Sequence, residues 1–308
     1  MSAAHGASDA ARRFLDPAVL ARLGRLDLAS RLAAESFLSG RHRSVRRGFS
    51  AEFSDYREYS PGDDVSDIDW RVYARTDKFY MKCFESETSM RCVLAVDTSA
   101  SMAYRSKSAP VPKGEYAALA AAALGYLLHR QRDRVGLALF DERLRRLVPP
   151  KSRRAHFYSI LELLAAGVDE PVPGEASRGL NELAVNLTRR GMVVILSDLL
   201  TAEGERLVRA IEHLAYRGQD VLVLQVLDPA ELSMAVPSGA VLREPESGRR
   251  FRIDGMGVAR CRQALAALLD RYRRRFHSMG VDYALLATGD PFDRAMGAFL
   301  ASRRWHRR

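Results

Sequence analysis

Three oxygen-bearing side chains, Asp97, Ser99 and Ser101, directly follow VLAV, the most strand-like run of the chain, at residues 93–96. Residues at every second position of an extended segment project to the same side. One carboxylate and two hydroxyls are hard ligands that suit Mg²⁺, whereas zinc would take His or Cys. The spacing indicates either a divalent-cation site or a serine-rich loop that hydrogen-bonds its own backbone, with Asp97 as a helix cap.

A second acid has the same context. The apolar run MVVIL at 192–196 ends in Ser197 and Asp198. In open parallel sheets, ligands bind outside the carboxyl ends of the strands, at the point where the strand order reverses. If the two strands are neighbours at that point, Asp97 and Asp198 face one site. The second acid therefore favours the metal site over the self-bonded loop.

The elements that must position these residues alternate between strand and helix from about residue 91 onward. Strands that are apolar on both faces and separated by helices indicate a doubly wound, mostly parallel α/β sheet of the Rossmann type. The predicted strands are Cys92–Val96, Val135–Phe140, its hairpin partner Leu144–Val148, Met192–Leu196, Val221–Leu227 and Tyr283–Leu286. The predicted helices are Glu115–Arg132, Arg154–Ala166, Leu180–Arg190, Glu205–Arg217 closed by Gly218, Val258–Met279 closed by Gly280, and Pro291–Arg303.

The first ninety residues have a different pattern. A helical stretch begins at Asp16 and ends near Gly40, and short strand-like pieces then surround a polar turn, SPGDDVSDID, at 60–69. We therefore expect two domains, a small N-terminal α+β layer over residues 1–90 and the α/β domain over residues 91–308.

Charged residues cluster in this polar turn. Four acids lie within seven residues and three arginines flank them: Asp63, Asp64, Asp67, Asp69, Arg57, Arg71 and Arg75. They indicate either a second cation site or catalytic acids, or a buried network of Asp–Arg pairs. The arginines favour the network because they can neutralise the acids. On that interpretation Trp70 packs in the core and is not a binding platform.

The residues after the two strands resemble the metal-ion-dependent adhesion site of von Willebrand factor A domains. That site carries D-x-S-x-S after the first strand, a Thr from a second loop and an Asp after the fourth strand. DTSAS at 97–101 and Asp198 match the first and last of these, but the loop DEPVPGEASRGL at 169–180 has no Thr, and Ser177 is its nearest hydroxyl. The resemblance implies strand order 3-2-1-4-5-6 with one antiparallel edge. It also implies one Mg²⁺ or Mn²⁺ ion held by Asp97, Ser99, Ser101, Ser177 and Asp198.

A longer and more specific match lies upstream, in EYSPGDDVSDIDWRVYARTDKFYMKCFESET at Glu58–Thr88. It resembles the signature of the bacterial family called domain of unknown function 58, in which this segment precedes a von Willebrand A-like domain. Members of that family are associated with AAA+ ATPases of the MoxR type, in systems that mature or assemble other proteins. The resemblance therefore implies an accessory or adaptor role, with such an ATPase or its client as partner.

Two functions remain open at this point. In the first, the chain is a protein-binding module in which a partner's Asp or Glu completes the coordination of the metal. In the second, it is a metal-dependent phosphoryl hydrolase that uses Asp97 or the Asp67/Asp69 pair. The hydrolase would require D-x-D after a strand and a lysine after a later strand. Residue 99 is Ser, SDL at 197–199 supplies no lysine, and no apolar strand precedes Asp67. We therefore expect a binding module and no enzyme.

Composition sets broader bounds. The net charge is +10, and its basic clusters at 41–47, 271–275 and 303–308 are solvated faces or a docking surface for an acidic partner. No recognisable reading motif accompanies them, so nucleic-acid binding through the basic tail is a third and weaker alternative. The three cysteines lack C-x-x-C spacing, which favours reduced thiols.

The longest uncharged stretch, Tyr116–Leu128, is too short to span a bilayer, and the N-terminus lacks the apolar run of a signal peptide. We expect a cytoplasmic protein.

Overall fold

The computed structural model describes residues 52–58, 70–76, 78–85, 89–166, 175–201, 204–234, 236–237, 239–244 and 248–290. These residues fall into two compact units, one within Leu38–Ser89 and one that runs from Met90 onward. Three predicted features lie outside the described residues, namely the helix from Asp16 to Gly40, the acids between Asp63 and Asp69, and the last helix, Pro291–Arg303. The predicted domain boundary at residue 90 therefore stays a prediction.

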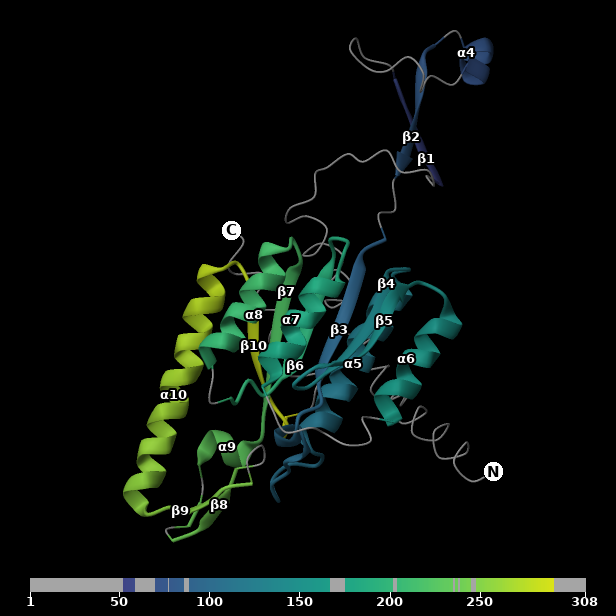
Figure 1. Cartoon of the computed structure of the whole chain (residues 1–308). Helices are drawn as coiled ribbons and strands as arrows, with labels where there is room; N and C mark the ends of the chain where they lie inside the picture. The colour runs from purple at the N-terminus through teal and green to yellow at the C-terminus, as the bar shows by residue number, and fades with distance from the viewer. Residues whose placement is uncertain are drawn as a thin grey trace, which may run out of the picture. The chain divides into compact units, whose positions relative to one another are not determined.

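The larger unit is built on a six-stranded sheet with the order β10-β7-β6-β3-β4-β5 (Figure 1). All neighbours are parallel except β4 and β5, which pair as an antiparallel hairpin. The strands are β3 (Arg91–Asp97), β4 (Arg134–Phe140), β5 (Leu144–Lys151), β6 (Met192–Ser197), β7 (Asp220–Leu227) and β10 (Asp282–Ala287). In order of appearance this is 3-2-1-4-5-6 with one antiparallel edge, so the predicted von Willebrand A-like α/β fold is confirmed.

Helices cover both faces of this sheet because its central strands are apolar on both sides. In β3, Leu94 and Val96 pack with α5 and α6 on one face, whereas Val93 and Ala95 pack with α7, α8 and α10 on the other. These helices are α5 (Lys113–Arg130), α6 (Arg154–Ala166), α7 (Ala176–Asn186), α8 (Gly204–Tyr216) and α10 (Gly255–Ser278). Gly218 and Gly280 follow α8 and α10 with φ of 82° and 69°, which is the left-handed conformation that closes helices. Across the described residues, no helix is long and apolar enough to cross a membrane.

One helix is displaced from its prediction. Helix α7 begins at Ala176 and ends at Asn186, four residues before each end of the predicted Leu180–Arg190. Its first turn packs closely on the end of β4, since a Cβ at Gly179 would lie 2.5 Å from the carbonyl oxygen of Asp141. The close contact with β4 shows that tertiary packing helps to set where this helix begins.

Three elements after β7 were not predicted. Helix α9 (Pro229–Ser233) is followed by a two-stranded antiparallel sheet of β8 (Val241–Arg243) and β9 (Arg250–Arg252). Helix α9 starts with a complete capping box, in which Asp228 accepts from the backbone and Glu231 reaches back to the Asp228 amide. The sequence DPAE at 228–231 carries this signal, with Pro229 at the first helical position.

The smaller unit pairs β1 (Glu52–Glu58) with β2 (Tyr80–Glu85) and contains the short helix α4 (Trp70–Thr76) between them. Trp70 makes edge-on ring contacts with Tyr73 and Phe79 but remains 58% exposed. The prediction that Trp70 packs in a core is therefore wrong. A two-stranded sheet and a seven-residue helix offer too little surface to enclose an indole ring at the helix's first residue.

Candidate metal centre

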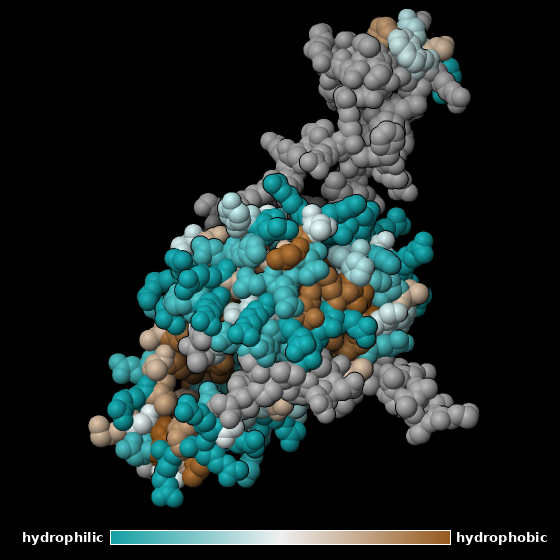
Figure 2. All heavy atoms as spheres, in the orientation of Figure 1, coloured by the Kyte–Doolittle hydropathy of each residue, from teal (hydrophilic) through white to brown (hydrophobic). Residues whose placement is uncertain are grey.

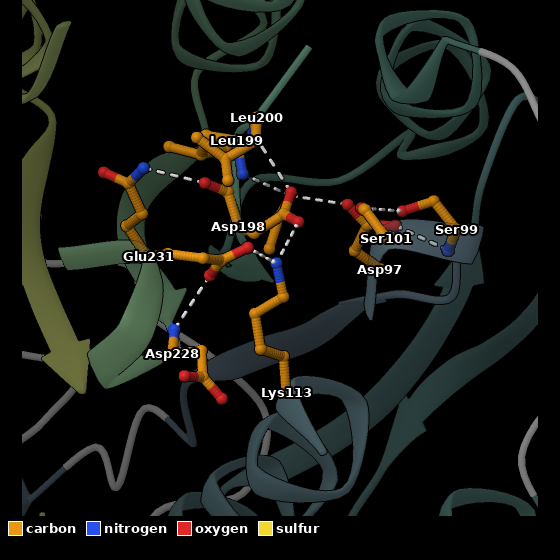
Figure 3. Close-up of polar contacts among 11 residues, drawn as sticks. Asp97, Ser99, Ser101, Lys113, Asp198, Leu199, Leu200, Asp228 and Glu231 are labelled. Carbon is orange, nitrogen blue, oxygen red and sulfur yellow. Dashed lines mark hydrogen bonds and ion pairs between the residues drawn. The ribbon is translucent and has the colours of Figure 1, made fainter. Parts of the chain in front are cut away.

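The two acids of the predicted site end neighbouring strands. Strand β3 pairs in parallel with β6, Asp97 is the last residue of β3, and Asp198 directly follows β6. The strand order reverses between them, because β4 lies beyond β3 on one side and β7 lies beyond β6 on the other. The prediction that these strands are neighbours at the reversal is confirmed, and Figure 3 shows the two carboxylates at the same edge of the sheet.

Asp97 is buried among donors that carry no charge. It is 2% exposed, its Oδ1 accepts from the Ser99 amide at 2.9 Å, and its Oδ2 accepts from Ser197 Oγ at 2.5 Å. Among the described residues, no cationic side chain pairs with it. Burial, with a further contribution from the charge of Asp198, raises the pKa of Asp97 to about 7, although the bonds from Ser197 and Ser99 oppose the rise.

The two serines lie beside this carboxylate. Ser99 and Ser101 are each 6% exposed, and their hydroxyl oxygens are 3.2 Å apart. The 3₁₀ turn η2 (Ala100–Ala103) brings them together, and Ser99 precedes this turn without a side-chain cap bond. Figure 3 shows Ser101 between Ser99 and the Asp198 carboxylate. The alternative prediction was a loop that hydrogen-bonds its own backbone. The structure contains one such bond, from the Ser99 amide to Asp97, whereas the hydroxyls of Ser99 and Ser101 face each other.

Asp198 has an environment that the sequence did not reveal. Its Oδ2 lies 2.7 Å from Nζ of Lys113, the first residue of α5, and its Oδ1 accepts from the Leu200 amide at 3.0 Å. The same ammonium lies 2.7 Å from Oε1 of Glu231 in α9. Lys113 is only 1% exposed. Burial alone would lower the pKa of Lys113, but the two carboxylates outweigh it and raise the pKa above its ordinary value.

This ion pair belongs to a longer chain of bonds. Glu231 Oε2 accepts from the Asp228 amide at 2.9 Å, and Asp228 Oδ2 accepts from the Ser106 amide at 2.8 Å. Asp228 is fully buried. The bonds thereby connect the loop before α5, the start of α9 and the turn after β6, so Asp198 is held in place by three separate segments.

Hydrogen bonds from side chains of other elements also hold the backbone that follows β6. Leu199 has φ of 53°, an unusual left-handed conformation for a buried branched residue. Its carbonyl accepts from Tyr272 OH at 3.1 Å, and the Asp198 carbonyl accepts from the Gln225 amide group at 2.7 Å. Tyr283 OH in turn donates to Gln225 at 2.6 Å. Burial raises the pKa of each tyrosine to about 12, which keeps both hydroxyls available as donors at neutral pH.

Ser177, the predicted substitute for the Thr ligand, lies in the first turn of α7. Because α7 leads into β6 and runs against it, that turn lies at the same edge of the sheet as Asp97 and Asp198. Ser177 is 4% exposed and its hydroxyl donates to Glu175 Oε2 at 3.5 Å. The structure therefore places Ser177 at the predicted edge, with Glu175 as its hydrogen-bond partner.

The donor set can be compared with what a divalent cation requires. Asp97, Ser99 and Ser101 together offer one carboxylate and two neutral hydroxyls, which fits a hard ion such as Mg²⁺. Asp198 fits less well as a direct ligand, because its Oδ2 is already paired with the ammonium of Lys113, whereas the donors to Asp97 carry no charge. Within the described part of the chain, no group of three or more His, Cys, Asp or Glu side chains could hold a metal. The residues that fit are thus those of the first loop.

The sequence did contain an indication that Lys113 has an acidic partner. It stands at the start of a helix, in PVPKGEY, where the macrodipole disfavours a positive charge. A lysine at that position, directly before an alanine-rich buried helix, indicates a carboxylate partner elsewhere in the fold. The sequence could not identify that partner, since Asp198 and Glu231 lie 85 and 118 residues away.

Two solved structures with similarity to this chain have TM-scores below 0.5. The conserved hypothetical protein BatB from Bacteroides thetaiotaomicron is 18% identical, with a TM-score of 0.43 over 70% of this chain and 99% of that chain. The SpRpn10 VWA domain is 10% identical, with a TM-score of 0.35 over 69% of this chain and 95% of that chain. The fold assignment rests on the strand order of the chain itself.

Sequence relatives cover almost the whole chain. The uncharacterized proteins Rv1480 of Mycobacterium tuberculosis and Mb1516 of Mycobacterium bovis are each 30% identical over 293 residues, which is 94% of this chain and 91% of theirs. The family model described as "Protein of unknown function DUF58" matches residues 55–275. This match includes the upstream signature and most of the α/β domain. The chain therefore belongs to the DUF58 family.

Proposed function

We propose that this chain is a protein-binding module that depends on a divalent cation held by Asp97, Ser99 and Ser101. The observation that carries the proposal is the isolation of Asp97, a carboxylate that is 2% exposed, next to two buried hydroxyls, with no cationic partner among the described residues. Burying an unpaired carboxylate is unfavourable, and a bound cation removes that penalty. Mg²⁺ or Mn²⁺ suits these oxygen donors.

Lys113 supports this division of roles. Its ammonium pairs with Asp198, so among the described carboxylates of the site Asp97 is the one without a cationic partner. An ion with two charges and one protein carboxylate retains a strong preference for a further acidic ligand. When bound, it supplies a coordination position for an Asp or Glu of a partner protein. Asp198 and Ser177 are then supporting residues, at the same edge of the sheet but engaged with Lys113 and Glu175.

The family resemblance suggests the partner. We propose that it is a MoxR-type AAA+ ATPase or a client of that ATPase, and that the chain acts as an accessory or adaptor in protein maturation or assembly. The loops that follow β3 and β6 and the first turn of α7 border the same edge of the sheet, where a partner's acidic side chain would reach the ion.

One observation bears on the hydrolase alternative. The hydrolase alternative requires a lysine at the end of a later strand. The lysine at this site is Lys113, which instead stands at the start of α5. Its ammonium, however, is shared by two carboxylates at 2.7 Å, and residue 99 is Ser where the hydrolase pattern requires Asp. The binding module therefore has the better support. Turnover of p-nitrophenyl phosphate with Mn²⁺, abolished in Asp97→Asn, would reverse this preference.

The proposal is tested by binding to a purified MoxR-type ATPase of the same organism, with Mg²⁺ and with EDTA. We expect Mg²⁺-dependent binding that is lost in Asp97→Asn and retained in the control Asp133→Asn, which changes another buried aspartate. A complex that forms equally well in EDTA, or that tolerates Asp97→Asn, would contradict the metal dependence.

A further inference from the structure

The β8–β9 hairpin extends from the edge of the sheet that carries Asp97 and Asp198. It follows α9, which follows the carboxyl end of β7, and α10 begins three residues after β9 (Figure 1). Helix α10 has 24 residues, or about 36 Å at 1.5 Å per residue, whereas six residues of β10 span about 20 Å. The buried residues of α10, Tyr272 and Phe276, both lie in its second half. Its first half therefore projects beyond the sheet together with the hairpin.

One face of this hairpin is strongly basic. The register pairs Val241 with Arg252 and Arg243 with Arg250, so these four side chains share a face. All four residues are exposed. Like charges directly opposite each other destabilise a strand pair, and in the described part of the chain no acidic side chain forms an ion pair with these three arginines. Nothing within the described fold accounts for this arrangement.

Apolar side chains accompany the arginines. Val241 is 58% exposed, Phe251 on the opposite face of the hairpin is 50% exposed, and Met256 in the first turn of α10 is 73% exposed. Figure 2 shows hydrophobic residues among hydrophilic ones on this part of the surface. Residues 241–258, which include the hairpin and the first turn of α10, contain four Arg and three acids, a net charge of +1, and three of these Arg share one face of the hairpin. We call this surface, formed by β8, β9 and the first turn of α10, the basic arm.

We propose that the basic arm binds an acidic segment of a partner protein that also carries apolar side chains. Arginine forms paired hydrogen bonds with carboxylates, and arginine and aromatic side chains dominate the energy of protein interfaces. A nucleic acid would meet exposed Val241 and Met256 with no gain, and a second copy of the chain would bring arginines against arginines. An acidic and apolar peptide satisfies both features of the surface.

This inference deepens the proposed function, because it specifies the chemistry of the partner and adds a second contact beside the metal. The arm contains no proposed metal ligand, so its contribution is expected to persist when the metal is removed. The two proposals can therefore fail separately.

The test uses a fluorescein-labelled peptide in which Glu alternates with Leu and Phe, measured by fluorescence anisotropy on the full chain in EDTA. We expect Arg243→Glu combined with Arg250→Glu to weaken binding about tenfold or more, since two paired charges are reversed. The matched control is Arg134→Glu combined with Arg189→Glu. It makes the same charge change at the opposite edge of the sheet, where both arginines are exposed and repel Arg91. The control is expected to bind within about twofold of the wild type.

Further variants and peptides distinguish specific binding by the basic arm from other causes of weaker binding. Val241→Ser, on the same face as the arginines, should also weaken binding, and a peptide with Gln in place of Glu should bind poorly. Circular dichroism checks that each variant is folded. Absence of peptide binding to the wild type, equal losses in the arm and control variants, or tighter binding of an oligonucleotide of similar length would each overturn the proposal. Peptide binding that requires Mg²⁺ and ignores the arm substitutions would overturn it and leave the metal-dependent module standing.

Discussion

The two acids at the edge of the sheet share a residue type and a depth of burial but differ in electrostatics. Asp97 and Asp198 are each 2% exposed and end neighbouring strands. Asp198 faces the ammonium of Lys113 at 2.7 Å, whereas Asp97 accepts from an amide and from the hydroxyl of Ser197. Among the described residues, the site thus has one half in which two carboxylates share a lysine and one half in which the carboxylate has no cationic partner.

This difference in electrostatics is the reason why we assign the metal to Asp97 and its neighbouring serines and not to Asp198. A buried carboxylate without a cation binds a proton more readily, and the pKa of Asp97 rises to about 7 as burial predicts. An ion pair with a lysine already provides Asp198 with what a metal would provide. A cation that enters this edge therefore gains most beside Asp97, and the following experiments test that contrast.

The largest effect is expected at Lys113. In Lys113→Met, the buried carboxylate of Asp198 and the partly buried carboxylate of Glu231 lose their cation, so the free energy of unfolding should fall by about 3–5 kcal/mol. Urea unfolding measures this loss. Adding Asp198→Asn to Lys113→Met should restore part of it, because one of the two unpaired charges is removed. A loss below about 1 kcal/mol would mean that the ion pair is not needed for the fold.

The opposite sign is expected at Asp97. In EDTA, Asp97→Asn should be at least as stable as the wild type, because it removes a buried charge that no described cationic side chain pairs with. With Mg²⁺ at a hundred times its dissociation constant, the wild type should gain about 2.7 kcal/mol and the variant should gain nothing. Thermal unfolding with and without Mg²⁺ reports both results. A Mg²⁺-dependent shift that survives in the variant would place the ion elsewhere.

A smaller effect should separate the serines. Ser99→Ala and Ser101→Ala should each weaken Mg²⁺ affinity about tenfold, since each removes an oxygen donor beside Asp97. Ser177→Ala is the matched control, because that hydroxyl donates to Glu175, and it should change the affinity less. Isothermal titration calorimetry measures all three. Equal losses in the three variants would return Ser177 to the set of direct ligands.

The smallest effect concerns Asp133, which is buried, has no ion pair with a described residue and accepts from the Met90 amide at 2.7 Å. Burial raises the pKa of Asp133 from 3.8 to about 6. The folded state therefore holds this proton more tightly than the unfolded chain. The stabilising contribution is complete below pH 3.8 and is lost as the pH rises through about 6.

Asp133→Asn removes this dependence and keeps an oxygen that can accept the Met90 amide bond. Relative to the wild type, the variant should therefore gain stability between acidic and neutral pH, with no change in the Mg²⁺ response. Melting temperatures of both proteins across that range provide the test. A difference that is constant with pH would show that Asp133 is charged in both states.

The sequence predicted those parts of the fold that depend on local pattern. Apolar runs that end abruptly in Asp97 and Asp198 indicated both the sheet and the edge where the site lies, and the strand order agrees. The β8–β9 hairpin was missed because its strands have three residues each, and arginines interrupt their apolar pattern. Trp70 was placed in a core because the neighbouring acids and arginines were interpreted as a buried network, but Trp70 is 58% exposed.

The site was harder to predict because its decisive contacts are long-range. Asp97, Ser99 and Ser101 are close in sequence, and their proximity follows from one turn. The pairing of Lys113 with Asp198 and Glu231 depends on the packing of α5 and α9 at the edge of the sheet, across 85 and 118 residues. No local periodicity encodes such a contact, although a lysine at a helix start indicates that some acid must meet it.

The most direct test of the account is the position of Mn²⁺ in crystals of the full chain, located by its anomalous scattering. We expect one ion bound by Asp97, Ser99 and Ser101, while Lys113 remains paired with Asp198 and Glu231. An ion between Asp198 and Glu231 with Lys113 displaced, or no ion beside Asp97 in Mn²⁺-saturated crystals, would contradict the division of the site into a lysine-paired half and a metal-binding half.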